Sequence, residues 1–104
     1  MSTCIASTAT VIDNAKVFDF AWVSGNAIVC DHARVSGHAI VCDNARVSGH
    51  AIVCDNAEIS DHVQVYNNAQ VKGKAWVSGI AFIGGDVTIS RGWIRNIHWW
   101  KDIP

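Results

Sequence analysis

The chain has 104 residues, which is long enough for one domain and too short for two domains with separate cores. Half of the residues are hydrophobic, yet no apolar run approaches the ~20 residues of a membrane-spanning helix, so we expect no membrane span. The net charge of -1 argues against a mainly electrostatic partner such as duplex DNA, and we expect no nucleic-acid partner.

The N-terminal stretch MSTCIASTAT has no basic segment followed by an apolar one, so it does not look like a secretion signal. We therefore expect a cytoplasmic protein, in which the four cysteines stay reduced. The single proline is Pro104, so nothing inside the chain marks a linker.

From Ile5 onward the chain follows a period of six residues. Every sixth residue from Ile5 to Ile89 is Val or Ile, and a second series from Ala9 to Val87 is Ala apart from two valines. A third series, two residues after each Val or Ile, contains almost only Gly, Asp and Asn. A period of six does not match the 3.6 residues of a helical turn, so the repeat is not helical.

Short strands separated by bends do match this period. Ala and Val, two residues apart, point to the same face of a strand and therefore inward. Gly, Asp and Asn tolerate a positive φ, which a sharp bend requires. The pattern predicts an all-β solenoid of short parallel strands.

The repeated pattern Val-x-[Gly/Asp]-x-Ala-x resembles the hexapeptide repeat of left-handed parallel β-helices, in which three hexads form a triangular coil of about 18 residues. Stretches such as AKVFDFAWVSG and HARVSGHA resemble the bacterial YdcK-like β-solenoid family in particular. The resemblance covers residues 5–94 and implies a single-stranded left-handed parallel β-helix of about five coils, to which we assign residues 1–94. Proteins with such repeats include acyltransferases, γ-class carbonic anhydrases and proteins with no known activity.

Two histidine–cysteine pairs raise the question of a zinc site. His38 precedes Cys42 by four residues, and His50 precedes Cys54 by four. Four residues of extended chain span roughly 13 Å, whereas zinc ligands lie within about 2.3 Å of the ion. With eighteen residues in a coil, Cys30, Cys42 and Cys54 fall at three different corners. We predict no metal site and no disulfide between them, and interpret the cysteines as small corner residues.

One outward column of the coils is unusually apolar. A bare apolar surface of this size is rare in monomers, and aromatic side chains are enriched in interface cores. We therefore predict a homo-oligomer, with the trimer of parallel helices that the resemblance implies as the first hypothesis. Glu58 lies in this column and needs a cationic partner if the interface buries it. The predicted interface consists of Phe20, Trp22, Ile40, Glu58, Trp76 and Ile94.

His32 and His50 are eighteen residues apart and should stack in another column. In hexapeptide-repeat acyltransferases a histidine at a subunit cleft is the general base, and in γ-class carbonic anhydrases three histidines hold a metal. The resemblance makes His32 and His50 the candidate catalytic residues. The uninterrupted repeat lacks pocket-forming loops, however, and histidine alternates with asparagine at this position, which favours a structural role. No phosphate-binding loop, nucleophile elbow or carboxylate pair is present, and we expect no cofactor.

The tail, residues 95–104, leaves the period of six. Arg95 falls in the Val/Ile series and Trp93 in the Ala series. An open solenoid end needs a cap, and apolar tail residues would supply one. The alternative is a docking segment for a protein partner, because tryptophan is common in binding hot spots. The residues proposed for either role are Trp93, Ile97, Trp99 and Trp100.

These features together predict a non-catalytic binding or scaffold protein that acts as a homo-oligomer and has a protein as a further partner. The shape of a small solenoid suggests an accessory or inhibitory protein of bacterial or phage origin. The alternative hypothesis is an acyltransferase-like enzyme with an active site between subunits.

Overall fold

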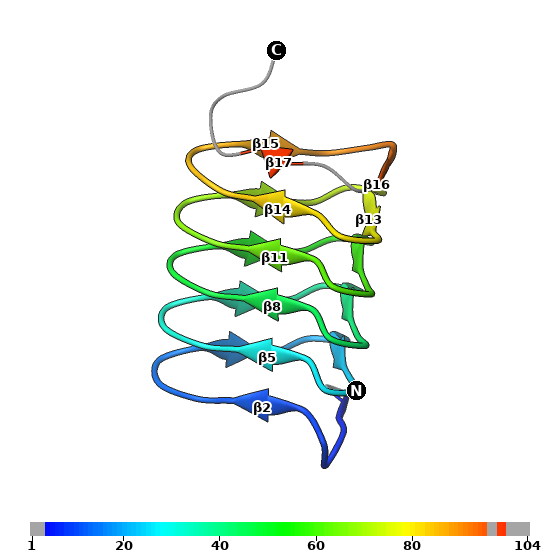
Figure 1. Cartoon of the computed structure of the whole chain (residues 1–104). Coiled ribbons are helices and arrows are strands. Elements are labelled where there is room, and N and C mark those ends of the chain that lie inside the picture. The colour runs from blue at the N-terminus through cyan, green and yellow to red at the C-terminus, as the bar shows by residue number, and fades with distance from the viewer. Residues whose placement is uncertain (1–3, 96–97, 100–104) are drawn as a thin grey trace.

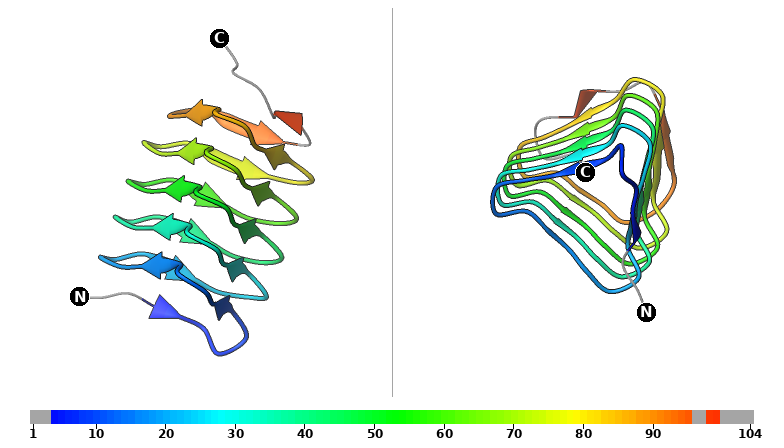
Figure 2. Two further views of the ribbon diagram at one scale, coloured as in Figure 1. Left: turned by 90° about the vertical axis from the view of Figure 1, so that its left-hand side faces the viewer. Right: turned by 90° about the horizontal axis from the view of Figure 1, so that it is seen from below.

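The chain winds into three parallel β-sheets that surround one core (Figure 1). The structure, a computed structural model, describes residues 4–95 and 98–99. Strands of two or three residues begin every six residues from Cys4 to Ile89, and the described residues contain no helix. Viewed along its axis the coil has a triangular outline (Figure 2). The predicted all-β parallel solenoid of about five coils is confirmed, whereas its left-handed sense stays a prediction.

Each sheet takes one strand from every coil. Sheet A contains β1 (Cys4–Ile5), β4 (Trp22–Val23), β7 (Ile40–Val41), β10 (Glu58–Ile59), β13 (Trp76–Ser78) and β16 (Trp93–Arg95). Sheet B contains β2 (Thr10–Val11), β5 (Ile28–Val29), β8 (Arg46–Val47), β11 (Gln64–Val65), β14 (Phe82–Ile83) and β17 (His98–Trp99). Sheet C contains β3 (Lys16–Val17), β6 (Arg34–Val35), β9 (Ile52–Val53), β12 (Gln70–Val71) and β15 (Thr88–Ile89).

The inward positions build an apolar core of small and medium-sized side chains. Ala45 and Val47 are fully buried, whereas Arg46 between them is exposed, because successive side chains of a strand point to opposite faces. The same pattern repeats in the other coils, so that columns of Val or Ile stand beside columns of Ala. Burial of each Val contributes about 1.5–3 kcal/mol, which gives the narrow coil its main stabilisation.

The corners are tight turns in which the backbone takes a positive φ. Asp31 has a φ of 60°, and the amide of Ala33 donates a 3.2 Å hydrogen bond back to the carbonyl of Cys30 across this turn. The Asp31 carboxylate reaches the next coil, where its Oδ2 accepts a 3.1 Å hydrogen bond from the amide of Gly49. Equivalent bonds join Asp13 to Asp31, Asp19 to Gly37, Asp43 to Asp61, Asp55 to Gly73, and Asp61 to Gly79.

Glycine replaces aspartate at several of these corners. Gly49 has a φ of 64°, and a Cβ placed on it would lie 2.8 Å from the backbone nitrogen of Asn67 in the next coil. Both the turn and the close approach of the neighbouring coil therefore favour a residue without a side chain. The predicted bends at the Gly/Asp/Asn positions are confirmed.

The path from β13 to β16 is one residue shorter than the corresponding path in the earlier coils. Coils pair with a register of eighteen residues up to β13, as Glu58 with Trp76 shows, but Trp76 pairs with Trp93 and Val77 with Ile94. The shortened corner moves Ile94 into the inward column, where it is half-buried against the core. The prediction that Ile94 faces outward in the interface column is wrong, because strict counting by six did not allow for this shortened corner.

Parts of the tail continue the sheets by their backbone. Arg95 ends β16, and β17 pairs with β14. Trp93 lies in the outward column of sheet A beside Trp76, not over the open end. Ile97 and Trp100 lie outside the described residues, as does the side chain of Trp99, so the capping or docking role of these residues stays a prediction.

Candidate functional site

The outward side of sheet A carries a continuous ladder of large side chains. Trp22, Ile40, Glu58, Trp76 and Trp93 follow one another in register from β4 to β16. The exposed fraction is 52% for Trp22, 44% for Trp76 and 57% for Trp93. Aromatic rings therefore project from a flat sheet at both ends of the ladder. We call these five residues the sheet A ladder.

Ring stacking orders the aromatic side chains on this side of the coil. The rings of Trp76 and Trp93 stack with centroids 4.9 Å apart, and Trp93 Nε1 donates a 3.1 Å hydrogen bond to Ser78 Oγ. Phe20, which is 55% exposed, stacks on the His38 imidazole with centroids 5.0 Å apart. Because these contacts order the rings of Trp76, Trp93 and Phe20 in the free chain, these rings would lose little side-chain entropy when a partner binds.

Glu58 interrupts the apolar ladder at its centre. It is exposed and pairs with Ile40 on one side and Trp76 on the other. In the part of the chain that the structure describes, no Lys, Arg or His nitrogen lies within 4.0 Å of its carboxylate. A partner that covers the ladder must therefore supply a cation or a hydrogen-bond donor to Glu58.

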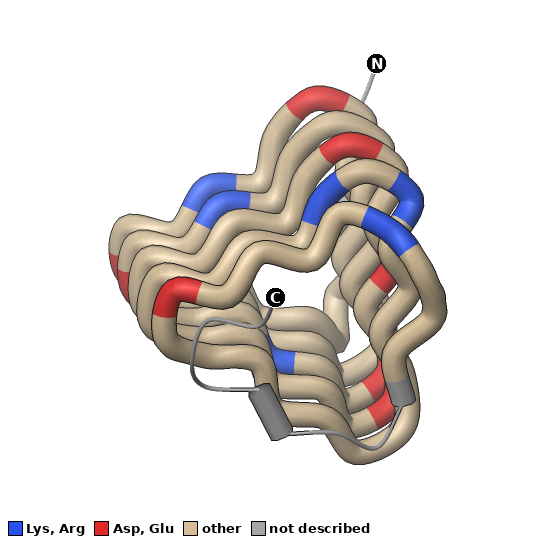
Figure 3. The backbone as a smooth tube through the Cα atoms, turned by 90° about the horizontal axis from the view of Figure 1, so that it is seen from above, with Lys and Arg blue, Asp and Glu red and all other residues tan. Residues whose placement is uncertain are grey.

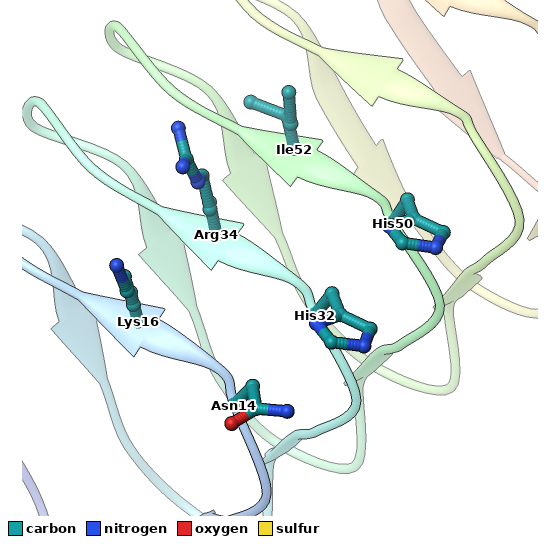
Figure 4. Close-up of a pocket in the computed structure, with 6 residues that line it drawn as sticks. All are labelled: Asn14, Lys16, His32, Arg34, His50 and Ile52. Carbon is teal, nitrogen blue, oxygen red and sulfur yellow. The ribbon is translucent and has the colours of Figure 1, made fainter.

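The outward side of sheet C carries a different, basic group of residues. Figure 4 shows two columns of side chains on the first three coils, and together they line a shallow hollow of about 570 Å³. The predicted stacking of His32 on His50 is confirmed, with centroids 4.9 Å apart and planes 3° from parallel. One column consists of Asn14, His32 and His50, and the other of Lys16, Arg34 and Ile52.

Among the described residues, the two histidines stack on each other but have no third group that orients them. A general base is normally oriented by a third group that hydrogen-bonds to its other ring nitrogen. Within residues 4–95 and 98–99, neither His32 nor His50 has a hydrogen-bond partner for its imidazole. Five of the six residues that line the hollow are exposed, so the hollow is open to solvent.

The cysteines occupy three different corners, as the spacing predicted. Cys42 follows β7 of sheet A, Cys30 follows β5 of sheet B, and Cys54 follows β9 of sheet C, all as free thiols. Burial raises the pKa of the Cys42 thiol to about 11, and the neighbouring carboxylates, Asp43 first, add to this. Burial likewise raises the pKa of Cys30 and Cys54. Protonated thiols are poor nucleophiles and poor metal ligands, which agrees with a corner-filling role.

No three His, Cys, Asp or Glu side chains among the described residues lie close enough together to hold a metal ion. His38 and Cys42 are the pair that first suggested zinc. The imidazole of His38 stacks on Phe20 before β7, whereas Cys42 is a free thiol at the corner after β7.

Two residues of the sheet C hollow were not singled out by the sequence. Lys16 and Arg34 pair in register on β3 and β6, beside the histidines. Each is a single basic residue in its own hexad, so no run of charges marks them in the sequence. The signal that finds them is the eighteen-residue spacing, which stacks one directly on the other.

The comparisons with known proteins agree with the fold. The model of the YdcK β-solenoid repeat matches residues 41–55, a stretch that includes β8 and β9. No curated protein and no solved structure matches the chain. The described part of the chain contains no helix that is long and apolar enough to cross a membrane. The three stacked parallel sheets show that the chain is a β-solenoid, and its repeat is similar to the YdcK β-solenoid repeat over the matched residues.

Proposed function

We propose that the protein is a non-catalytic binding solenoid that acts as a homo-oligomer through the sheet A ladder. The observation that carries this proposal is the row of exposed aromatic rings on a flat, regular sheet. Trp22, Trp76 and Trp93 each leave about half of their side chain in water. Large exposed apolar patches on small proteins generally mark binding surfaces.

The energy available from this surface is sufficient for association. An aromatic side chain buries about 150–250 Å² when fully covered, so a half-exposed ring still has roughly 100 Å² to bury. At about 25 cal/mol per Å², each ring contributes about 2–3 kcal/mol. Three such rings and Ile40 on each chain would offset the entropy lost on association.

A parallel trimer is the arrangement that the resemblance to hexapeptide-repeat proteins supports. Three copies with parallel axes would bring their sheet A ladders together, and each Glu58 would face a neighbouring chain. Lys74 precedes the ladder strand β13 and is exposed. Its ammonium group would supply the positive partner that the Glu58 carboxylate needs in the interface. Arg46 of a neighbouring copy would serve equally well.

Sedimentation velocity tests the interface. We expect the wild-type chain to sediment as an oligomer at tens of micromolar, and Trp22→Lys with Trp76→Lys to sediment as a folded, smaller species. Both positions are outward-facing, so neither change disturbs the core. A wild-type monomer, or a double variant with wild-type mass, would contradict the proposal.

A matched control adds the same charge elsewhere on the coil. Asn26 and Thr88 are exposed residues outside the sheet A ladder, Asn26 at a corner and Thr88 on β15 of sheet C. Asn26→Lys with Thr88→Lys should keep the wild-type mass. Dissociation of this control as well would show that added charge, not loss of the aromatic rings, separates the chains.

The stacked histidines in the sheet C hollow keep a second candidate function open, an acyltransferase-like enzyme that uses His32 or His50 between subunits. Acetyl-CoA distinguishes the two. For a non-catalytic solenoid we expect no acyl transfer. Saturable acetyl-CoA binding together with acyl transfer, both lost in His50→Ala, would favour the enzyme.

A further inference from the structure

The structure points to a second binding site, and we propose that the sheet C hollow binds a phosphate dianion through Lys16, Arg34, His32 and His50. This site lies on a different face from the sheet A ladder and does not depend on the proposed oligomer.

The first observation is a pair of unneutralised cations. Lys16 and Arg34 are exposed and directly opposite each other in the register of β3 and β6. In the described part of the chain, neither lies within 4.0 Å of a carboxylate. Like charges directly opposite in a sheet repel each other, so the arrangement is unfavourable unless an anion lies between them. Figure 3 shows basic segments of neighbouring coils side by side on one flank of the solenoid, with acidic segments gathered at its corners.

The second observation is the position of the two histidines. His32 lies two residues before Arg34, on the same outward side of the sheet, and its ring stacks on that of His50. Neighbouring strands are about 4.8 Å apart, and residues two apart on a strand are about 7 Å apart. The four residues therefore lie within one patch of the backbone. Rotation of the long Lys16 and Arg34 side chains, which extend away from the imidazoles in Figure 4, would bring all four groups within hydrogen-bond reach of one phosphate. Figure 4 shows their side chains standing on the same side of sheet C.

The nearby carboxylates do not fill this patch. Asp13 and Asp31 lie at the corners that precede β3 and β6. Their carboxylates accept hydrogen bonds from the backbone amides of Asp31 and Gly49, respectively. Asp86 lies in the histidine column but four coils from Asn14, with Asn68 between it and His50. Arginine, lysine and imidazole N–H groups together suit a phosphate ligand. The arginine and lysine donate charge-assisted hydrogen bonds to separate phosphate oxygens.

Phosphate titration monitored through the histidine NMR signals tests the site. Inorganic phosphate is added up to tens of millimolar, while sodium chloride keeps the ionic strength constant. We expect the ring signals of His32 and His50 to shift and saturate. Those of His38 and His62, which face other sides of the coil, should stay in place. Equal, unsaturated shifts of all four would overturn the proposal, and this result needs no variant.

Substitutions separate the site from a general charge effect. Lys16→Gln with Arg34→Gln should weaken phosphate binding about tenfold, since two exposed charge-assisted contacts are lost. Lys72→Gln with Arg91→Gln removes the same charge from parts of the coil outside the hollow and the sheet A ladder, and should leave binding within a factor of about two. Equal weakening in both double variants would contradict a localised site. Circular dichroism confirms that each variant is folded before titration.

Comparison of inorganic phosphate with phenyl phosphate distinguishes a site for free phosphate from a site for a phosphate monoester. Saturation with inorganic phosphate and with phenyl phosphate at similar concentrations identifies the free anion as sufficient. Tighter binding of phenyl phosphate identifies a phosphate monoester, with Ile52 at the edge of the hollow as the apolar contact. Either result supports the site, and saturation by neither overturns it.

Discussion

The aspartate corners allow the contributions of backbone conformation and hydrogen bonding to be separated at one residue. Asp31 combines a φ of 60° with a carboxylate that accepts the amide of Gly49 at 3.1 Å. Asp31→Ala keeps a Cβ in the left-handed region and loses the hydrogen bond. Asp31→Gly loses the same hydrogen bond but removes the Cβ. Asp31→Asn keeps both a tolerated conformation and an acceptor oxygen.

The expected changes in the free energy of unfolding follow from these differences. A side chain in the left-handed region costs roughly 1–2 kcal/mol, and aspartate and asparagine reduce part of this cost by local hydrogen bonds. A hydrogen bond to an exposed acceptor contributes about 1 kcal/mol. We expect Asp31→Ala to lose about 2 kcal/mol, Asp31→Gly about 1 kcal/mol or less, and Asp31→Asn less than about 0.5 kcal/mol.

Urea unfolding at a single protein concentration measures the series, with tryptophan fluorescence and circular dichroism as two probes. The same concentration is required because an oligomer gains stability by mass action. If Asp31→Gly destabilises the protein as much as Asp31→Ala does, the positive φ is not what selects residues at these corners. If Asp31→Asn is as unstable as Asp31→Ala, the bond to the next coil depends on the charge of the acceptor rather than on its geometry.

Three further predictions concern the core, the corners and the last coil. Val47 is fully buried, so Val47→Asp places an unpaired charge in the core and should abolish the folded circular dichroism spectrum; a variant with an unchanged melting temperature would contradict the assigned core. Burial raises the pKa of Cys42 to about 11, so the folded state holds this proton more tightly than the unfolded state. Its contribution to stability is complete below pH 9, the thiol's ordinary value, and is lost as the pH rises towards 11. The urea midpoint should therefore fall less between pH 8 and pH 10.5 in Cys42→Ser than in the wild type, and equal falls would contradict the shift. Trp93→Ala removes the ring stacked on Trp76 and the hydrogen bond to Ser78, and should cost about 2 kcal/mol in urea unfolding, whereas Trp93→Phe, which keeps the stacking, should cost about 1 kcal/mol.

The candidate sites were predictable from the sequence only in part. The stacking of His32 on His50 and the outward position of Trp22 and Trp76 follow directly from the spacing of eighteen residues. The basic character of the hollow beside the histidines does not follow from it, because the hollow depends on Lys16 and Arg34, and only the structure shows that no carboxylate of the described residues lies beside them. Whether a partner covers the sheet A ladder is equally outside the sequence pattern, since an exposed tryptophan looks the same in a monomer and in an interface.

The sequence by itself determined the repeat, the inward columns and the bends. Side chains of a strand alternate strictly, and only a few residue types tolerate a positive φ, so a period of six leaves one architecture for Val47 and Ala45 to fill. The tertiary structure alone decided what happens where the period ends. Ile94 turns inward and Trp93 outward because one corner is a residue shorter, and a slip of one residue moves every side chain of a strand to its other face. The bonds from aspartates such as Asp31 to the next coil were also decided there, because they join residues that only the winding of the chain brings together.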